Sequence, residues 1–284
     1  MIHITKDLSK VPTKLTDKKT DFENAITSKK YQKESYKVVQ KNLIDLYNDK
    51  CAYCETSLKN NFRAVEHYRP KNSNVKIFRK CDTTHGYYWL ALSWSNLVLS
   101  CSYCNSYKGC CFDIKNTAKR VGFNNETFET IHAITKQYNK DEEPLLIHPE
   151  IDKPEAFIAF DINGKIKKNN PRISYTVDIC KLNRDDLIEL RMTILNEFRK
   201  KLNTSFNTFE ASKSRNLISF QAGIKDFFCR ANSNKSSFTA WRRYILKNHK
   251  QFLFKDDNEH FNTIVELALF KYKVLYCEVH RLKN

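Results

Sequence analysis

Glycine and proline are scarce in this chain, with 5 and 6 residues among 284. Folds with many tight turns depend on these two residues, so their scarcity argues against a sandwich or barrel and favours helices. No apolar run approaches the roughly 20 residues that span a bilayer. The opening MIHITKDLSKVP also lacks the apolar stretch of a signal peptide. We therefore expect no membrane partner and a cytoplasmic location.

Negative charge is in short supply relative to positive charge. The chain has 49 Lys and Arg against 32 Asp and Glu, which gives a formal net charge of +17. A positive field concentrates phosphates and releases their counterions, so a polyanionic partner is favoured over a merely solvated basic surface. Charge alone does not choose between DNA, RNA and an anionic membrane.

Ten cysteines require an explanation other than disulfides, because cytosolic thiols stay reduced. Four of them form two Cys-x-x-Cys pairs, Cys51 with Cys54 and Cys101 with Cys104. A single pair could equally be redox-active, but two pairs predict a tetrahedral structural zinc with four sulfur ligands. The other six cysteines have no ligand spacing, and most of them are interpreted as small buried hydrophobes.

The segment between the two pairs is longer than a compact zinc ribbon allows, and it carries an acid–histidine pair, Glu66-His67. Asn105 directly follows the second pair, in the first turn of an expected helix. Hydrolysis of a phosphodiester needs a base near neutral pH, which suits His67. It also needs a divalent ion such as Mg²⁺ or Mn²⁺, for which carboxylate and amide oxygens are suitable ligands. The zinc would bring these groups together.

The order of motifs resembles the His-Asn-His (HNH) nucleases with a ββα-metal core. The motifs are Cys-x-x-Cys, (Asp/Glu)-His-x-x-Pro, Asn-Leu, Cys-x-x-Cys-Asn and Lys-Gly. The resemblance implies that His67 is the general base and that Glu66 is a ligand of the catalytic metal. It implies that Asn96, otherwise readable as a turn cap, orients the hairpin and the base. Asn105 stands where the family often has a metal-binding His, a departure that would shift metal preference.

A closer resemblance is to the PtuB nucleases of bacterial Septu anti-phage systems. It rests on the runs CAYCE, VEHYRPK and YYWLALSWSNLVLSCSYCNSYKG, and on weaker similarities over roughly two thirds of the chain. It implies a PtuA-like ATPase as partner. Because some members are encoded beside retrons, it also implies a retron reverse transcriptase and its nucleic-acid product. The chain itself has no Gly-rich phosphate loop of the Walker type.

Three basic residues near the acid–histidine pair are candidate nucleic-acid contacts. Arg69 and Lys71 follow the base closely, and Lys108 follows the second cysteine pair. Each could instead be a solvated side chain. The rival to a DNA- or RNA-cutting endonuclease is a non-catalytic zinc-stapled nucleic-acid-binding or adaptor module. The enzyme is favoured because an inert ribbon has no need of the Glu66-His67 pair.

Together these patterns predict an α+β, mainly helical fold, with a zinc-stapled ββα-metal core between N-terminal helices and a helical C-terminal region. We expect a helical segment over 1–48, the nuclease core over 49–125, and a small β-hairpin followed by a helical partner-binding region over 126–284. Local patterns give the following elements: a helix over 20–50, strands over 62–68 and 96–100, a loop over 72–86, an Asn163-Gly164 turn, and helices from Asp185 and over 261–275.

Overall fold

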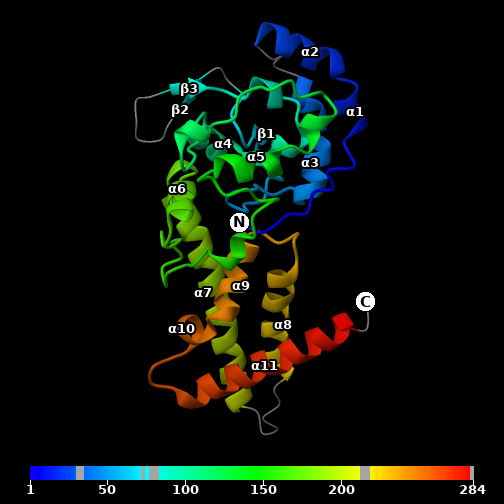
Figure 1. Cartoon of the computed structure of the whole chain (residues 1–284). Helices are drawn as coiled ribbons and strands as arrows, with labels where there is room; N and C mark the ends of the chain where they lie inside the picture. Colours follow the sequence, from blue (N-terminus) through cyan, green and yellow to red (C-terminus); the bar gives the residue numbers. More distant parts are fainter. Residues whose placement is uncertain (30–34, 72–73, 77–82, 212–217, 282–284) are drawn as a thin grey trace. The chain divides into compact units, whose positions relative to one another are not determined.

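The computed structural model describes residues 1–29, 35–71, 74–76, 83–211 and 218–281, and these are mainly helical (Figure 1). They form two compact units. The first comprises Met1–Ile158 and Ile166–Asn183, and the second comprises Ala159–Lys165 and Arg184–Asn284. The sequence predicts three segments, with boundaries after residue 48 and after residue 125. Both boundaries lie inside the first unit, and the three-segment division stays a prediction.

The first unit contains short helices around two small antiparallel ladders. Its helices are α1 (Thr13–Thr16), α2 (Lys19–Ser28), α3 (Gln40–Tyr47), α4 (Ser102–Lys108), α5 (Thr135–Glu142) and α6 (Pro171–Ile179). Its strands are β1 (Arg63–His67), β2 (Asn74–Lys76), β3 (Thr83–His85) and β4 (Leu97–Cys101). Its described residues also form the 3₁₀ turns η1 (Ser35–Val39), η2 (Tyr88–Leu90), η3 (Trp94–Asn96), η4 (Thr117–Lys119), η5 (Thr130–His132) and η6 (Pro154–Ala156).

Two expectations for this unit need correction. The predicted helix over 20–50 is interrupted, because Lys29 adopts a left-handed conformation (φ 53°) that ends α2. The predicted loop over 72–86 contains the β2–β3 ladder, in which Asn74 is paired with His85. The two strands predicted on either side of the long insertion are confirmed as β1 and β4.

The centre of the first unit is the β1–β4 pair. The strands are antiparallel, with Glu66 opposite Val98 and His67 opposite Leu97. All residues of β4 are buried, and α4 starts directly after it and contacts both strands. This strand–strand–helix arrangement brings together segments far apart in the chain and carries the candidate site.

The N-terminal segment supports the start of β4. The buried ammonium of Lys6 donates to the carbonyls of Trp94 (3.0 Å) and Leu97 (2.6 Å) and forms an ion pair with Glu150 (2.7 Å). Because a buried charge is tolerated only when it is paired, these contacts fix the opening residues against the turn that precedes β4.

The second unit consists mainly of helices. Its helices are α7 (Asp185–Ala211), α8 (Ile218–Asn232), α9 (Thr239–Lys247), α10 (His249–Leu253) and α11 (Glu259–Arg281). Contacts join α8 to α7, α9 and α11, and the rings of Phe198 and Phe227 stack with centroids 3.8 Å apart. The helices predicted from Asp185 and over 261–275 are confirmed.

The predicted Asn-Gly turn is also present in the second unit. The amide of Asp161 donates to the carbonyl of Lys165 (2.9 Å). Gly164 has φ 76°, and a Cβ built there would lie 3.2 Å from that of Arg191, so glycine is required. The flanking described residues do not extend into strands, so a full β-hairpin does not form.

None of the helices among the described residues combines enough length with enough apolar character to cross a bilayer.

His132 should make the stability of the protein depend on pH. The ring is buried, and its Nδ1 accepts a hydrogen bond from the amide of Trp94 (3.2 Å), which protonation at that atom would break. Burial lowers the pKa of His132 from 6.5 to about 4, with Glu129 opposing the shift. Between pH 6.5 and about 4, His132 is therefore protonated in the unfolded chain but neutral in the folded chain. We expect stability to be lost as pH falls from 6.5 to about 4, by up to about 3 kcal/mol from this residue.

The measurement is denaturant unfolding at several pH values on the parent and on His132→Gln. The His132→Gln variant should lose less stability between pH 7 and pH 4. The control is His260→Gln, at an exposed position, and it should follow the parent. Parallel pH profiles for all three proteins would contradict the assignment.

Candidate metal centre and active site

The four cysteines of the two pairs meet in one buried cluster. The ligand atoms of Cys51, Cys54, Cys101 and Cys104 all lie within 4.8 Å of one another. With a Zn–S bond of about 2.3 Å, two sulfurs of a tetrahedral site are about 3.8 Å apart. The Sγ atoms of Cys54 and Cys101 are separated by 3.8 Å. The donor set and its spacing therefore fit zinc.

Local backbone geometry holds each pair in place. The amide of Glu55 donates to the carbonyl of Cys51 (3.0 Å), and the backbone of Glu55 is in the left-handed conformation (φ 62°). Together these close the tight turn that carries Cys51 and Cys54, here called the first knuckle. Cys101 is the N-cap of α4, and its Sγ accepts from the amide of Cys104 (3.3 Å). One pair thus lies on a tight turn and the other on a helix start.

The thiols of the cluster differ in acidity. Burial raises the pKa of the Cys51 thiol well above its usual value, whereas hydrogen bonding from Cys101 lowers that of Cys54 well below it. Four thiolates this close would repel one another. A divalent ion would stabilise all four as thiolates.

Glu66 lies on β1 and is bound to Lys108 of α4. The Nζ of Lys108 is 2.7 Å from the Oε1 of Glu66 and donates to the carbonyl of His67 (2.9 Å). Lys108 is fully buried, and Glu66 is 7% exposed. This pair joins the helix to the strand and holds one oxygen of the Glu66 carboxylate in a fixed position.

His67 is held in a defined orientation. Its Nε2 is 2.9 Å from the carbonyl of Ala91, which can only accept, so Nε2 carries the proton. Its Nδ1 is buried and has no hydrogen-bond partner among the described residues. Burial, reinforced by Lys71 and Lys108, holds the pKa of His67 well below 6.5. The ring is thus neutral at pH 7, with an unprotonated Nδ1.

Asn96 ties the end of the β1 segment to the turn before β4. Its Oδ1 accepts from the amide of Arg69 (2.8 Å), and its Nδ2 donates to the carbonyls of Arg69 (3.0 Å) and Leu90 (3.2 Å). All of these groups are buried. This geometry fixes the backbone two residues after His67.

Asn105 lies on α4 between Cys104 and Lys108 and is partly exposed. Its carbonyl accepts from the amide of Gly109 (2.9 Å). Within the part of the chain that the structure describes, its side-chain amide makes no hydrogen bond, so the structure brings it to the same helix as Lys108 without a direct contact to Glu66.

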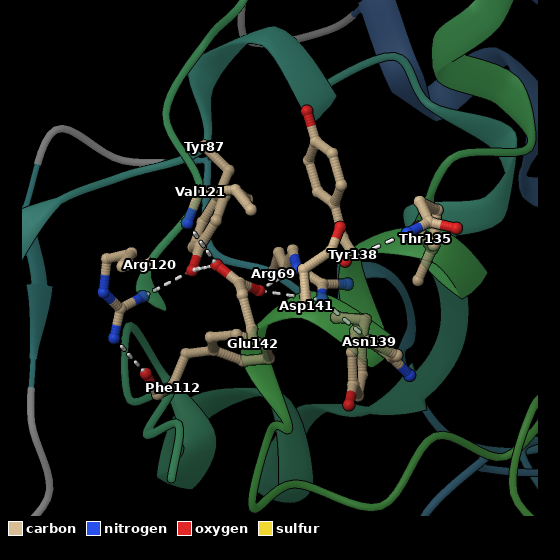
Figure 2. Close-up of polar contacts among 12 residues, drawn as sticks. Arg69, Tyr87, Phe112, Arg120, Val121, Thr135, Tyr138, Asn139, Asp141 and Glu142 are labelled. Carbon is tan, nitrogen blue, oxygen red and sulfur yellow. Dashed lines mark hydrogen bonds and ion pairs between the residues drawn. The ribbon is translucent and has the colours of Figure 1, made fainter. Parts of the chain in front are cut away.

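The structure places two of the three predicted nucleic-acid contacts in the core. Arg69 is fully buried, with its guanidinium bound to Glu142 and to the Oδ1 of Asn139, each at 2.8 Å. Lys108 is buried against Glu66, as described above. Figure 2 shows Arg69 directed inward toward Glu142. Because both cations are enclosed and paired, we assign them to holding the fold rather than to a phosphate surface.

The Arg69–Glu142 pair belongs to a larger buried network (Figure 2). The other oxygen of Glu142 accepts from the hydroxyl of Tyr87 (2.6 Å) and from the amide of Val121 (3.0 Å). Arg120 donates to the same hydroxyl (2.5 Å). This network attaches α5 and the segment after α4 to the chain just past His67.

Lys71 is the predicted contact that remains partly exposed. Its Nζ lies 4.8 Å from the ring centroid of Tyr36, and the Tyr36 ring meets the imidazole of His67 edge-on at 4.6 Å. Burial lowers the pKa of Lys71. Tyr36 was missed by motif analysis, because nothing in the sequence links it to a histidine 31 positions away.

A second feature missed from sequence is an aromatic pair on α4. Tyr103 and Tyr107 are 58% and 48% exposed, and their rings stack with centroids 6.5 Å apart. Their four-residue spacing places both on one helix face. Sequence patterns did not reveal this exposed aromatic surface, because it depends on which side chains the fold buries.

Comparison with known proteins finds relatives by sequence. The chain is 32% identical over 191 residues to Septu protein PtuB of Bacillus mycoides (strain KBAB4), covering 65% of this chain and 59% of the relative. It is 26% identical over 271 residues to Septu protein PtuB of Bacillus thuringiensis, covering 89% and 84%. It is also 29% identical over 154 residues to Septu protein PtuA of Bacillus mycoides (strain KBAB4), covering 54% of this chain and 20% of that protein.

Two other comparisons return nothing. No protein-family model matches the chain. No solved structure matches it.

Removal of one cysteine ligand should release the predicted zinc. We expect one zinc per chain in the purified parent and a loss of that zinc, with lower stability, in Cys104→Ser, because three thiolates leave the tetrahedral site open. Elemental analysis and thermal unfolding measure both effects. Cys229→Ser is the control, since Cys229 is exposed, and it should keep the metal. Zinc retained in Cys104→Ser would contradict the four-sulfur site.

Lys108→Met should strongly destabilise the first unit. The substitution leaves the buried Glu66 carboxylate without its cation, and we expect a loss of about 3–5 kcal/mol in the free energy of unfolding. Lys115→Met, which removes an exposed partner of Glu143, should cost about 1 kcal/mol or less. Adding Glu66→Gln to Lys108→Met should recover part of the loss in chemical unfolding. A cost for Lys108→Met no larger than that of the control would refute the pairing.

Proposed function

Because the chain is a PtuB-like Septu protein, we propose that it is a metal-dependent endonuclease of the HNH type that serves an anti-phage defence system. The observation that carries the proposal is the state of His67. Its Nε2–H donates to the carbonyl of Ala91, and its Nδ1 has no hydrogen-bond partner among the described residues. A neutral, oriented imidazole with one unprotonated nitrogen is what a general base requires.

The arrangement of β1, β4 and α4 supports a ββα-metal core. The two strands present Glu66 and His67 at the end of β1, and α4 carries Asn105. The cysteine cluster holds the start of α4 to the first knuckle. In this proposal Asn96 fixes the backbone beyond His67, consistent with its bonds to Arg69.

The proposed reaction is hydrolysis of a phosphodiester bond. The Nδ1 of His67 accepts a proton from the attacking water. Lys108 keeps the Glu66 carboxylate and the His67 carbonyl in fixed positions through its hydrogen bonds to both. Glu66 and Asn105 offer a carboxylate and an amide oxygen, a donor set that fits a hard divalent cation. When bound there, Mg²⁺ or Mn²⁺ would supply charge stabilisation to the phosphate and the leaving oxygen.

The proposed substrate is DNA or RNA, supported by the net charge of +17. Lys71, beside His67, is the predicted phosphate contact that the structure leaves partly exposed. The exposed rings of Tyr103 and Tyr107 on α4 could in addition stack on bases.

The proposed partner is a PtuA-like ATPase. The relative named PtuA contains a segment similar to this chain within a much longer protein. Because a segment similar to this chain occurs inside the protein named PtuA, we take an association between this chain and a PtuA-like protein as the proposal. For a system encoded beside a retron, its reverse transcriptase and nucleic-acid product are further candidate partners.

One observation favours the rival, a non-catalytic nucleic-acid-binding or adaptor module. His67 is 2% exposed, and one oxygen of Glu66 is already bound to Lys108. A catalytic base must meet water, so the enzyme requires that substrate or metal binding opens a path to Nδ1. The adaptor requires no such change, and the two hypotheses differ in whether any metal-dependent cutting occurs.

His67→Ala should abolish cleavage while leaving the zinc in place. We expect at least about a 100-fold loss of rate, because general-base catalysis contributes that much or more. The assay uses plasmid DNA and structured RNA with Mg²⁺ or Mn²⁺, on the chain alone and with the PtuA homologue of the same source. His260→Ala, at an exposed position of α11, should cut at the parent rate. Metal-dependent cleavage unaltered by His67→Ala would exclude His67 as the base, and no cleavage by the parent in either setting would favour the adaptor.

A further inference from the structure

A groove of about 490 Å³ lies within the second unit, between α8, α9, α10 and α11. These helices contact one another through α8 with α9, α8 with α11, and α9 with α10 (Figure 1). The groove is far in sequence from the cysteine cluster and contains none of the residues assigned to hydrolysis. It therefore requires a function of its own.

The walls of the groove are largely apolar. Phe228 and Ala231 of α8, Leu246 of α9, and Leu269 and Phe270 of α11 line it. Phe270 is 67% exposed, and the adjacent Leu267 is 54% exposed. A large aromatic left in water beside an apolar hollow, on a helix otherwise packed on α8, indicates a surface that another molecule covers.

The rim of the groove is positively charged. Arg243, Lys247 and Lys273 line it, against one acid, Glu266. Glu266 is itself paired with Lys250 at 3.1 Å. The charge left facing an occupant is therefore positive, and an occupant with carboxylates along its edges would be complementary.

From this geometry we propose that the groove binds an acidic amphipathic helix of a protein partner. A helix can place an apolar stripe between α8 and α11 and direct acidic side chains toward Arg243, Lys247 and Lys273. A nucleic acid would satisfy the basic rim but would leave the apolar floor without complementary surface. The inference rests on the proposed function in one respect, because it takes the PtuA-like protein as the partner that supplies this helix.

The test measures binding of the full chain to the PtuA homologue of the same source, with the homologue immobilised. Phe270→Asp and the double change Lys247→Glu with Lys273→Glu should each raise Kd about tenfold or more. Two matched controls lie outside the groove. Leu190→Asp adds a charge at an exposed apolar position of α7, and Lys225→Glu reverses an exposed charge of α8. Both controls should bind like the parent.

A photo-crosslinking amino acid in place of Phe270 identifies the occupant. Mass spectrometry of the crosslinked peptide should show an acid-rich helical segment of the PtuA homologue. A parent chain that does not bind the homologue, groove variants that bind as tightly as the controls, or crosslinks to nucleic acid or to a basic segment would each overturn the proposal.

Cleavage assays on the same variants separate this inference from the proposed function. If the parent binds the homologue through the groove but cuts no nucleic acid, the nuclease fails and the groove assignment stands. If the parent cuts and the groove variants bind normally, the groove assignment fails and the nuclease stands.

Discussion

The first unit depends on the meeting of two cysteine pairs that are 47 residues apart at their nearest members. Strands β1 and β4 are short, and a two-stranded ladder has little stability in water by itself. A metal ion held by the four sulfurs would offset this weakness, because it would tie the Cys51–Cys54 turn to the start of α4 and so fix the helix against both strands. Glu66 and His67 of β1 are thereby placed against α4, where Lys108 contacts both of them.

Buried ion pairs then complete what the cluster begins. Lys108 links α4 to Glu66, Arg69 links the end of β1 to Glu142, and Lys6 links the N-terminal segment to Glu150. Each pair costs desolvation, which the attraction between the two charges and their hydrogen bonds offset. As a result, the backbone around His67 is held by three separate buried ion pairs.

The same pairs show what motif analysis could not predict about the surroundings of two basic side chains. Arg69 and Lys108 carry the charge that phosphates attract, and nothing in their sequence neighbourhood reveals Glu142 or Glu66 as partners. A cation is equally suited to a phosphate and to a carboxylate. Only the burial of both groups decides between them.

The sequence by itself determined the grouping of the four cysteines, the strands around Glu66-His67 and the helical character of the second unit, because spacing and periodicity are local properties. The tertiary structure decided the state of His67, whose tautomer depends on a carbonyl 24 residues away, and the roles of Arg69 and Lys108. It also decided that Phe270 is exposed beside an apolar hollow. These are properties of contacts between distant segments, and no local pattern encodes them.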